Sequence, residues 1–268
     1  MSDKIKRIGL WGGFNSGKTT LLASLYAKRH ELGWEMTPED PSDNETRRFI
    51  QEVNDLAQKG ILPAATPGGT IREYAFSFEP ITQPQWYRLI GRPIHYQVEI
   101  VDVSGEDITR KGDQKIVFES LEQSEGILML IDPNAEHDNL TNLFDVVSKL
   151  KTSTHHYAFC LTKMDLDQNY PYISDPQAYL EQVLGESTFQ EIRNLFKKGL
   201  ARTFAVSAVG RYQTPSGSER PNLIYVVDDK GNLDRQGRLA KTGSFWSPIG
   251  IMEPLAWLFE RVSGLTVS

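Results

Sequence analysis

Cysteine is almost absent from this sequence, and so are long apolar runs. Cys160 is the only cysteine among 268 residues, which excludes an intramolecular disulfide and a cysteine-based metal cluster. The longest aliphatic stretch, ILMLI, is far shorter than the roughly 20 residues that a membrane-spanning helix needs. The first residues are basic but lack the apolar segment of a secretory signal, and no lipidation motif is present. We therefore expect a cytoplasmic protein without a membrane anchor.

An excess of positive charge is also missing. The chain has 29 Lys and Arg against 35 Asp and Glu, a net charge of −6. No field over the whole molecule would attract nucleic acid or anionic lipid, so a nucleic acid is not an expected partner and any polyanion must be held by a local site. Hydrophobic residues make up 39% of the chain, which is ordinary for a globular protein. We predict a single domain over residues 1–268.

Apolar and amphipathic segments alternate along the chain and predict an α/β fold. Strands are expected at 5–12, 71–79, 94–103, 126–132, 157–162 and 201–207. Helices are expected at 18–31, 113–124, 138–152, 176–198 and 254–263. Strands that alternate with helices imply parallel crossovers and three layers, with helices on both faces of the sheet. The stretch 71–79 should pair with 94–103 as an antiparallel hairpin, which gives a mostly parallel sheet with one antiparallel edge strand.

Two segments lie outside this alternation and are interpreted as inserts. Residues 33–66 are expected to hold a helix, with Asp43 as its N-cap and Phe49, Val53 and Leu56 on its apolar face. Each insert is either packed decoration or a surface for a partner protein.

The second insert covers residues 211–248. It begins with YQTPSGSERP, a loop by composition, and continues with apolar stretches around Asp-Lys-Gly-Asn that predict a β-hairpin. Pro254 then suits the first turn of a closing helix. The buried face of that helix is expected to consist of Leu255, Leu258, Phe259 and Val262.

The stretch GGFNSGKT at residues 12–19 fits the Walker A pattern, G-x-x-x-x-G-K-[ST]. Its glycines allow successive backbone N–H groups to turn towards a phosphate, and Lys18 adds a cation for the β- and γ-phosphates. The hydroxyl of Thr19 is a ligand for Mg²⁺, and the following helix points its positive end at the anion. The predicted nucleotide contacts are Gly12, Gly13, Phe14, Asn15, Ser16, Gly17, Lys18, Thr19 and Thr20. The alternative is a glycine-rich turn with an incidental lysine.

Three later motifs bear on the kind of nucleotide. Asp102 ends a strand and Gly105 follows, so that Asp102 can hold Mg²⁺ and the Gly105 N–H can meet a γ-phosphate. After the strand at 157–162, Asp165 can accept hydrogen bonds from the N1–H and 2-amino group of guanine, which adenine cannot supply.

The other base contacts follow the same two strand ends. Thr162 belongs to the same motif as Asp165, and the Lys163 stem can lie over the base. Ser207 and Ala208 end the next strand, where a backbone N–H could meet the guanine O6. The alternative for Thr162, Lys163 and Asp165 is a solvated strand end with unrelated charges, and the pair Ser207–Ala208 is unspecific by itself.

These motifs, in this order and on these strand ends, resemble the Ras-like fold of the translation-factor-related (TRAFAC) class of P-loop GTPases. Three segments resemble prokaryotic double-GTPase (DO-type) domains. They are the long segment before the switch region, the sequence SGED at the start of the switch, and the C-terminal sequence GIMEPLAWLF. The resemblance implies a threonine in switch I that closes on Mg²⁺ and the γ-phosphate. Thr70, just ahead of a strand, is the preferred candidate, and Thr66 is the alternative.

The chain departs from the family pattern in two places. Glu106 stands where many small GTPases have a glutamine that orients the attacking water, which implies slow or partner-dependent hydrolysis. The P-loop carries Asn15, and an asparagine at this position resembles the P-loop of K⁺-activated GTPases that dimerise across the nucleotide. Arg110 and Lys111 follow Glu106 and could contribute charge, although solvated side chains are the simpler interpretation.

The sequence therefore predicts a switch that binds GTP and GDP and hydrolyses GTP with Mg²⁺, with Lys18, Thr70 and Glu106 as the catalytic candidates. Its metal ligands would be Thr19, Thr70 and Asp102. A protein effector or regulator, or a second GTPase in a nucleotide-dependent dimer, is the expected partner. The alternatives are a GTP-binding scaffold with little hydrolysis and a P-loop ATPase or kinase.

Overall fold

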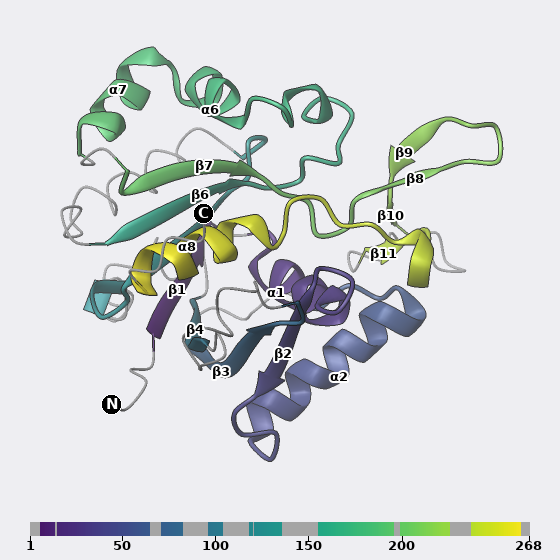
Figure 1. Ribbon diagram of the computed structural model, residues 1–268. Helices are drawn as coiled ribbons and strands as arrows, with labels where there is room; N and C mark the ends of the chain where they lie inside the picture. The colour runs from purple at the N-terminus through teal and green to yellow at the C-terminus, as the bar shows by residue number, and fades with distance from the viewer. Residues whose placement is uncertain are drawn as a thin grey trace.

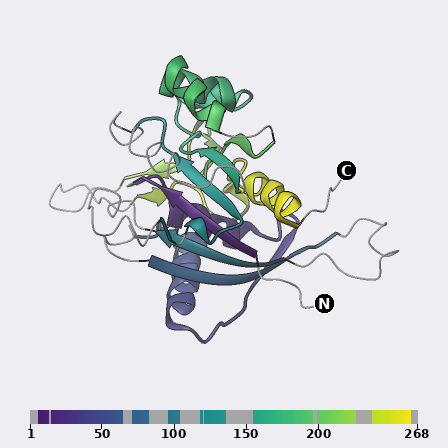
Figure 2. The same ribbon diagram turned by 90° about the vertical axis from the view of Figure 1, so that its left-hand side faces the viewer.

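The computed structural model describes most of the chain. The described residues are 6–13, 15–64, 71–82, 96–103, 118–119, 121–135, 155–195, 199–225 and 237–263. Seven strands of this part form one sheet, which Figures 1 and 2 show from two sides. In spatial order they are β2 (Trp34–Pro38), β3 (Ile71–Pro80), β4 (Tyr96–Val103), β1 (Lys6–Gly12), β5 (Gly126–Ile131), β6 (His156–Leu161) and β7 (Ala201–Ala205).

The pairing is mostly parallel, which confirms the predicted fold class. The strands β4, β1, β5, β6 and β7 run parallel to one another, and β3 is antiparallel to β4. The antiparallel pair β3–β4 was predicted, but the position of β3 at the edge is wrong. The short strand β2 pairs with the outer side of β3, from Trp34 opposite Pro80 to Pro38 opposite Phe76. Only Met36 of β2 is buried, so its sequence carries little apolar signal.

Helices cover both faces of the sheet because consecutive strand residues, which point to opposite faces, are apolar. Ile8 and Leu10 of β1 face one hydrophobic cluster and Trp11 faces the other. The first cluster is covered by α1 (Lys18–Lys28), α2 (Asn44–Lys59) and α8 (Glu253–Ser263). The second is covered by α6 (Pro176–Leu184) and α7 (Glu186–Leu195), which lie at the top of Figure 1.

The helix expected over 176–198 is two helices. Gly185 has φ 78° and ψ 149°, a conformation that interrupts the helical hydrogen bonds and that glycine adopts without strain. Each helix then buries its own face, for example Leu180 in α6 and Ile192 in α7. The helix α1 ends at Lys28, before the end at residue 31 that the sequence predicts.

The first insert contains the predicted helix as well as β2. The Asp43 carboxylate caps α2 by accepting from the Thr46 N–H at 2.9 Å, and Phe49, Val53 and Leu56 are buried. The structure therefore confirms the N-cap and the buried apolar face that the sequence predicts for this helix.

The second insert is more ordered than its composition suggests. The stretch expected to be a loop forms a hairpin of β8 (Arg211–Gln213) and β9 (Glu219–Pro221). The predicted hairpin after it is present as β10 (Leu223–Ile224) and β11 (Arg238–Leu239), followed by the short 3-10 helix η3 (Gly243–Phe245). In the closing helix, Leu255, Leu258 and Phe259 are buried as expected, while Val262 is half-buried.

The two inserts are hydrogen-bonded to each other. The N–H of Leu239 donates to the carbonyl of Gly60 at 2.7 Å, and the N–H of Leu62 donates to the carbonyl of Gly237 at 3.2 Å. Ile61 and Arg238 form an antiparallel bridge between these bonds. The chain that leaves α2 is therefore attached to the second insert just before residues 65–70.

Candidate functional site

The predicted site residues that the structure describes lie at or just after the ends of strands that meet at one edge of the sheet. Because β1, β4, β6 and β7 are parallel, their carboxyl ends meet there. The strand β1 lies between β4 and β5, so the strands that follow it in the chain are added first on one side of β1 and then on the other. This arrangement, a topological switch point, is where open α/β sheets bind ligands.

The loop between β1 and α1 has the backbone of a phosphate cradle. Asn15 has φ 57° and Gly17 has φ 88°, both in the left-handed region that turns consecutive N–H groups to one side. The N–H of Ser16 donates to the carbonyl of Gly13 at 3.2 Å. Gly17 is also the N-cap of α1, so the positive end of the helix faces the loop.

Lys18 lies along this loop. Its side chain places Nζ 2.9 Å from the Gly12 carbonyl oxygen and 3.2 Å from the Gly13 carbonyl oxygen, and the residue is only 7% exposed. The Lys18 side chain therefore holds a cation against the backbone of this loop. Of the other predicted contacts in this stretch, Thr19 is buried and Thr20 is half-buried in the first turn of α1.

Gly12 is required by close packing. A Cβ atom at this position would lie 2.6 Å from the Leu130 carbonyl oxygen and 2.6 Å from the Ser16 hydroxyl, whereas one at Gly13 would meet nothing within 4 Å. The backbone at the start of the loop can approach β5 only without a side chain at residue 12.

Replacing Gly12 with alanine is therefore expected to destabilise the protein by about 1–3 kcal/mol, the usual range for forced overpacking. Urea unfolding of the nucleotide-free protein measures this loss. Gly13→Ala is the matched control, since the added methyl group has open space, and it should change stability by less than about 0.5 kcal/mol. Equal stabilities of the two variants would contradict the packing argument.

The residues present fit a magnesium ion. Thr19, a residue with a hydroxyl group, lies in the first turn of α1, and the backbone register places the aspartate Asp102 opposite Leu10 of β1, near the end of β4. Hydroxyl and carboxylate oxygens are the hard ligands that Mg²⁺ takes in nucleotide sites, together with phosphate oxygens.

Asp165 and Ser207 are brought together from different strands. Asp165 is only 2% exposed, and its carboxylate accepts a hydrogen bond from the Ser207 hydroxyl at 2.6 Å. The same hydroxyl accepts from the Gly210 N–H at 2.9 Å. Burial raises the pKa of Asp165 above its usual value, while the Ser207 hydrogen bond and the cations of Arg211 and Lys163 act in the opposite direction.

The rest of the T-K-x-D turn is attached to the end of β5. The Thr162 N–H and hydroxyl donate to the Ile131 carbonyl at 2.8 and 3.2 Å. Lys163, at φ 55°, contacts the Asp132 carboxylate with its Nζ at 2.5 Å. Asn169, fully buried, donates to the Lys163 carbonyl at 2.9 Å and so closes the turn.

Two residues that hold these loops were not predicted from the sequence. The Trp246 indole N–H donates to the Ala208 carbonyl at 3.0 Å, and Trp246 is almost fully buried. Arg211 donates to the Asp165 carbonyl and, at 2.8 Å, to the Asp167 carboxylate. Their partners are distant in the sequence, so no spacing pattern could have identified them.

Several predicted site residues lie outside the described residues. They are Phe14, Thr66, Thr70, Gly105, Glu106, Arg110 and Lys111. The choice between Thr66 and Thr70, and the place of Glu106, therefore stay predictions.

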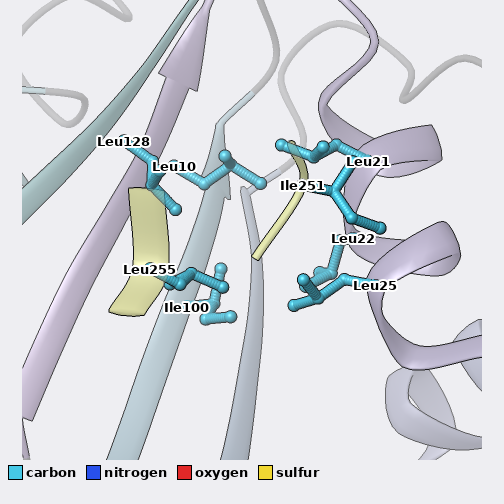
Figure 3. A pocket seen from close by; sticks show the side chains of 8 residues that line it. All are labelled: Leu10, Leu21, Leu22, Leu25, Ile100, Leu128, Ile251 and Leu255. Carbon is cyan, nitrogen blue, oxygen red and sulfur yellow. The ribbon is translucent and has the colours of Figure 1, made fainter. Parts of the chain in front are cut away.

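The cavity seen in Figure 3 has an apolar lining, unlike the polar candidate site at the edge of the sheet. It lies between the sheet, α1 and the α8 segment, and its lining is entirely aliphatic. The lining residues are Leu10, Leu21, Leu22, Leu25, Ile100, Leu128, Ile251 and Leu255. A space without polar groups suits core packing rather than a nucleotide.

Comparison with solved structures identifies the fold. The small GTPase Arl6 (BBS3) from Trypanosoma brucei, with a bound nucleotide analogue, matches with TM-score 0.50 and 13% identity over 98% of this chain and 100% of that chain. The GTPase-like domain of S. cerevisiae Ski7, bound to GTP, matches with TM-score 0.44 and 14% identity over 98% of this chain and 51% of that chain. The G domain of the T. maritima FeoB iron transporter matches with TM-score 0.35 and 15% identity over 77% and 89%.

The sequence comparisons add no name. No protein-family model matches the chain, and no curated protein sequence is significantly similar to it. At 13% identity the Arl6 structure supports the fold alone. The chain has the Ras-like P-loop GTPase fold, which confirms the resemblance at the level of fold. Similarity to DO-type domains stays a prediction. Within the described residues, no helix combines the length and apolar character needed to cross a membrane.

Proposed function

We propose that the chain is a single GTPase domain that binds GTP and GDP and hydrolyses GTP to GDP and phosphate with Mg²⁺. One observation carries this proposal: a lysine-bearing phosphate loop and a buried aspartate suited to guanine lie at the same edge of one parallel sheet. The first group has the chemistry for a polyphosphate, and the second has the chemistry for a purine with N1–H and a 2-amino group.

In this proposal the loop residues bind and orient the triphosphate. Lys18 exchanges its hydrogen bonds to the loop carbonyls for phosphate oxygens and neutralises charge there. Thr19 and Asp102 would hold the metal, with Thr70 joining them when switch I closes. When bound, Mg²⁺ neutralises charge on the phosphate oxygens. At the other end, Asp165 selects guanine and the Lys163 stem lies over the base.

The catalytic water would be placed by Thr70 and Glu106. A glutamate can orient water but adds negative charge beside a triphosphate, so we expect slow intrinsic hydrolysis that a partner protein accelerates. An effector, a regulator or a second GTPase would be that partner.

A single-turnover assay tests the reaction. The protein is mixed with Mg²⁺ and a substoichiometric amount of GTP or ATP, and phosphate release is followed in K⁺ and in Na⁺ buffer. We expect GTP to be hydrolysed and ATP to remain, because Asp165 rejects adenine. If Asn15 helps to hold a K⁺ ion, the rate is higher in K⁺ than in Na⁺, and the solution mass with a non-hydrolysable GTP analogue is that of a dimer.

The assay also separates the competing functions. Bound GTP that releases no phosphate would favour a GTP-binding scaffold, which the acidic Glu106 supports. Hydrolysis of ATP in preference to GTP would contradict the proposal and favour an ATPase. Equal rates of phosphate release in K⁺ and Na⁺ would contradict the predicted role of Asn15 and leave the rest of the proposal unchanged.

A further inference from the structure

Arg211 connects the hairpin β8–β9 to the loop that carries Asp165. Its guanidinium donates to the Asp165 carbonyl, to the Asp167 carboxylate at 2.8 Å and to the Glu219 carbonyl at 3.0 Å. The guanidinium also lies over the Tyr170 ring, 4.3 Å from its centroid. The Arg211 side chain is only 10% exposed, whereas its partner Asp167 is 76% exposed, so the contact with the Asp165 carbonyl is the more buried one.

These contacts restrain the backbone of Asp165, whereas Ser207 restrains its carboxylate. The Ser207 hydroxyl takes one lone pair of Oδ1, which leaves the carboxylate able to accept two further hydrogen bonds. A bidentate contact with guanine requires the carboxylate plane to be held within about 10–20° of the productive orientation. Ser207 alone fixes one oxygen and leaves rotation about that contact, so a second anchor at the backbone matters for the orientation.

We propose that Arg211 is a positioning residue for guanine recognition, because its guanidinium fixes the Asp165 peptide so that both carboxylate oxygens face the base. This proposal rests on the proposed function. It assigns a role to the second insert, whose strand β9 supplies the Glu219 carbonyl that holds Arg211 in place.

The charge of Arg211 supports the same role. Burial raises the pKa of Asp165, and Arg211 and Lys163 are the cations that oppose this effect. Ser207 adds a hydrogen bond to the charged form, and Asp167 partly neutralises the Arg211 cation. An ionised Asp165 is the form that accepts from both donors of guanine.

A purely structural role for Arg211 makes a different prediction. If Arg211 only fastens the hairpin, its loss weakens all nucleotides alike through general loosening. If it orients Asp165, its loss weakens the contact to the 2-amino group more than the contacts to the phosphates. Inosine diphosphate lacks the 2-amino group, so the ratio of GDP affinity to IDP affinity reports the bidentate contact.

The experiment measures equilibrium binding of GDP, IDP and ADP to the wild type, Arg211→Gln, Arg211→Lys and Arg220→Gln. Arg220 is the matched control, because it is an exposed arginine on β9 of the same hairpin. The wild type should prefer GDP to IDP by about tenfold or more, the value of a hydrogen bond to a charged acceptor. In Arg211→Gln this ratio should fall by about threefold or more, and Arg220→Gln should keep it.

Arg211→Lys keeps the charge but cannot supply the planar fork, so its ratio should also fall, though less than that of Arg211→Gln. If Arg211→Gln does not fold, the lysine variant carries the test by the same ratio. An unchanged ratio in the folded variant overturns the role of Arg211 and leaves the proposed function intact. A wild type that binds ADP as tightly as GDP overturns the proposed function itself.

Discussion

Asp165→Asn is expected to lower the affinity for GDP by about a hundredfold or more and to create affinity for xanthosine diphosphate. The carboxylate accepts from two donors of guanine, and hydrogen bonds to a charged group are each worth about 1.5–3 kcal/mol. An amide at the same place offers one acceptor and one N–H donor, so it repels the 2-amino group and suits the 2-oxo group of xanthine. Titration calorimetry with GDP, xanthosine diphosphate and ADP measures the change.

The matched control for this variant is Asp40→Asn, which removes the same charge at an exposed turn where the carboxylate accepts from Ser42. It should leave all three affinities unchanged. If folded Asp165→Asn keeps its preference for GDP, Asp165 does not read the base.

The wild type should also lose GDP affinity as the pH is lowered. Burial raises the pKa of Asp165 above the usual carboxyl value, so protonation begins at a higher pH than for an exposed aspartate. The protonated group accepts poorly from one of the two guanine donors. Affinity should therefore be full above this pKa and decline below it, and a flat profile through the acid range would contradict the assignment.

Lys18→Met is expected to lower the affinity for GDP and GTP by about a hundredfold or more, with a much smaller effect on GMP. Methionine is nearly as long as lysine, but it carries no charge and cannot neutralise the β- and γ-phosphates. The ratio of GDP affinity to GMP affinity, measured by titration, isolates the phosphate contact from any general loosening.

Lys59→Met serves as the matched control, since Lys59 is an exposed lysine of α2 whose Nζ pairs with Asp55 at 2.7 Å. It should keep the GDP to GMP ratio of the wild type. Urea unfolding without nucleotide shows whether loss of the Lys18 hydrogen bonds to the Gly12 and Gly13 carbonyls also destabilises the loop. An unchanged ratio in Lys18→Met would mean that the loop is not a phosphate site.

The elements with strong local signals were predicted well. The run at 126–131 is buried throughout and forms β5, and the Asp43 cap with its apolar spacing forms α2. The elements with weak local signals were missed. The strand β2 buries only Met36 and exists because it completes the open side of β3, and β8 and β9 depend on their mutual pairing and on Arg211. Tertiary contacts, rather than propensity, decide such short strands.

By itself, the sequence predicted the order of the strands and helices that have strong local signals, and it predicted candidate site residues at the strand ends. A phosphate loop needs glycines and a lysine next to one another, and a base-reading turn needs an aspartate within a few residues, so both are visible as local patterns. The tertiary structure alone decided how these groups are held. Ser207 orients Asp165, Trp246 holds the Ala208 carbonyl, and Arg211 ties the Asp165 peptide to the second insert. Each of these contacts joins residues about 40 positions apart, and only the folding of the parallel sheet and its inserts brings them within hydrogen-bond distance.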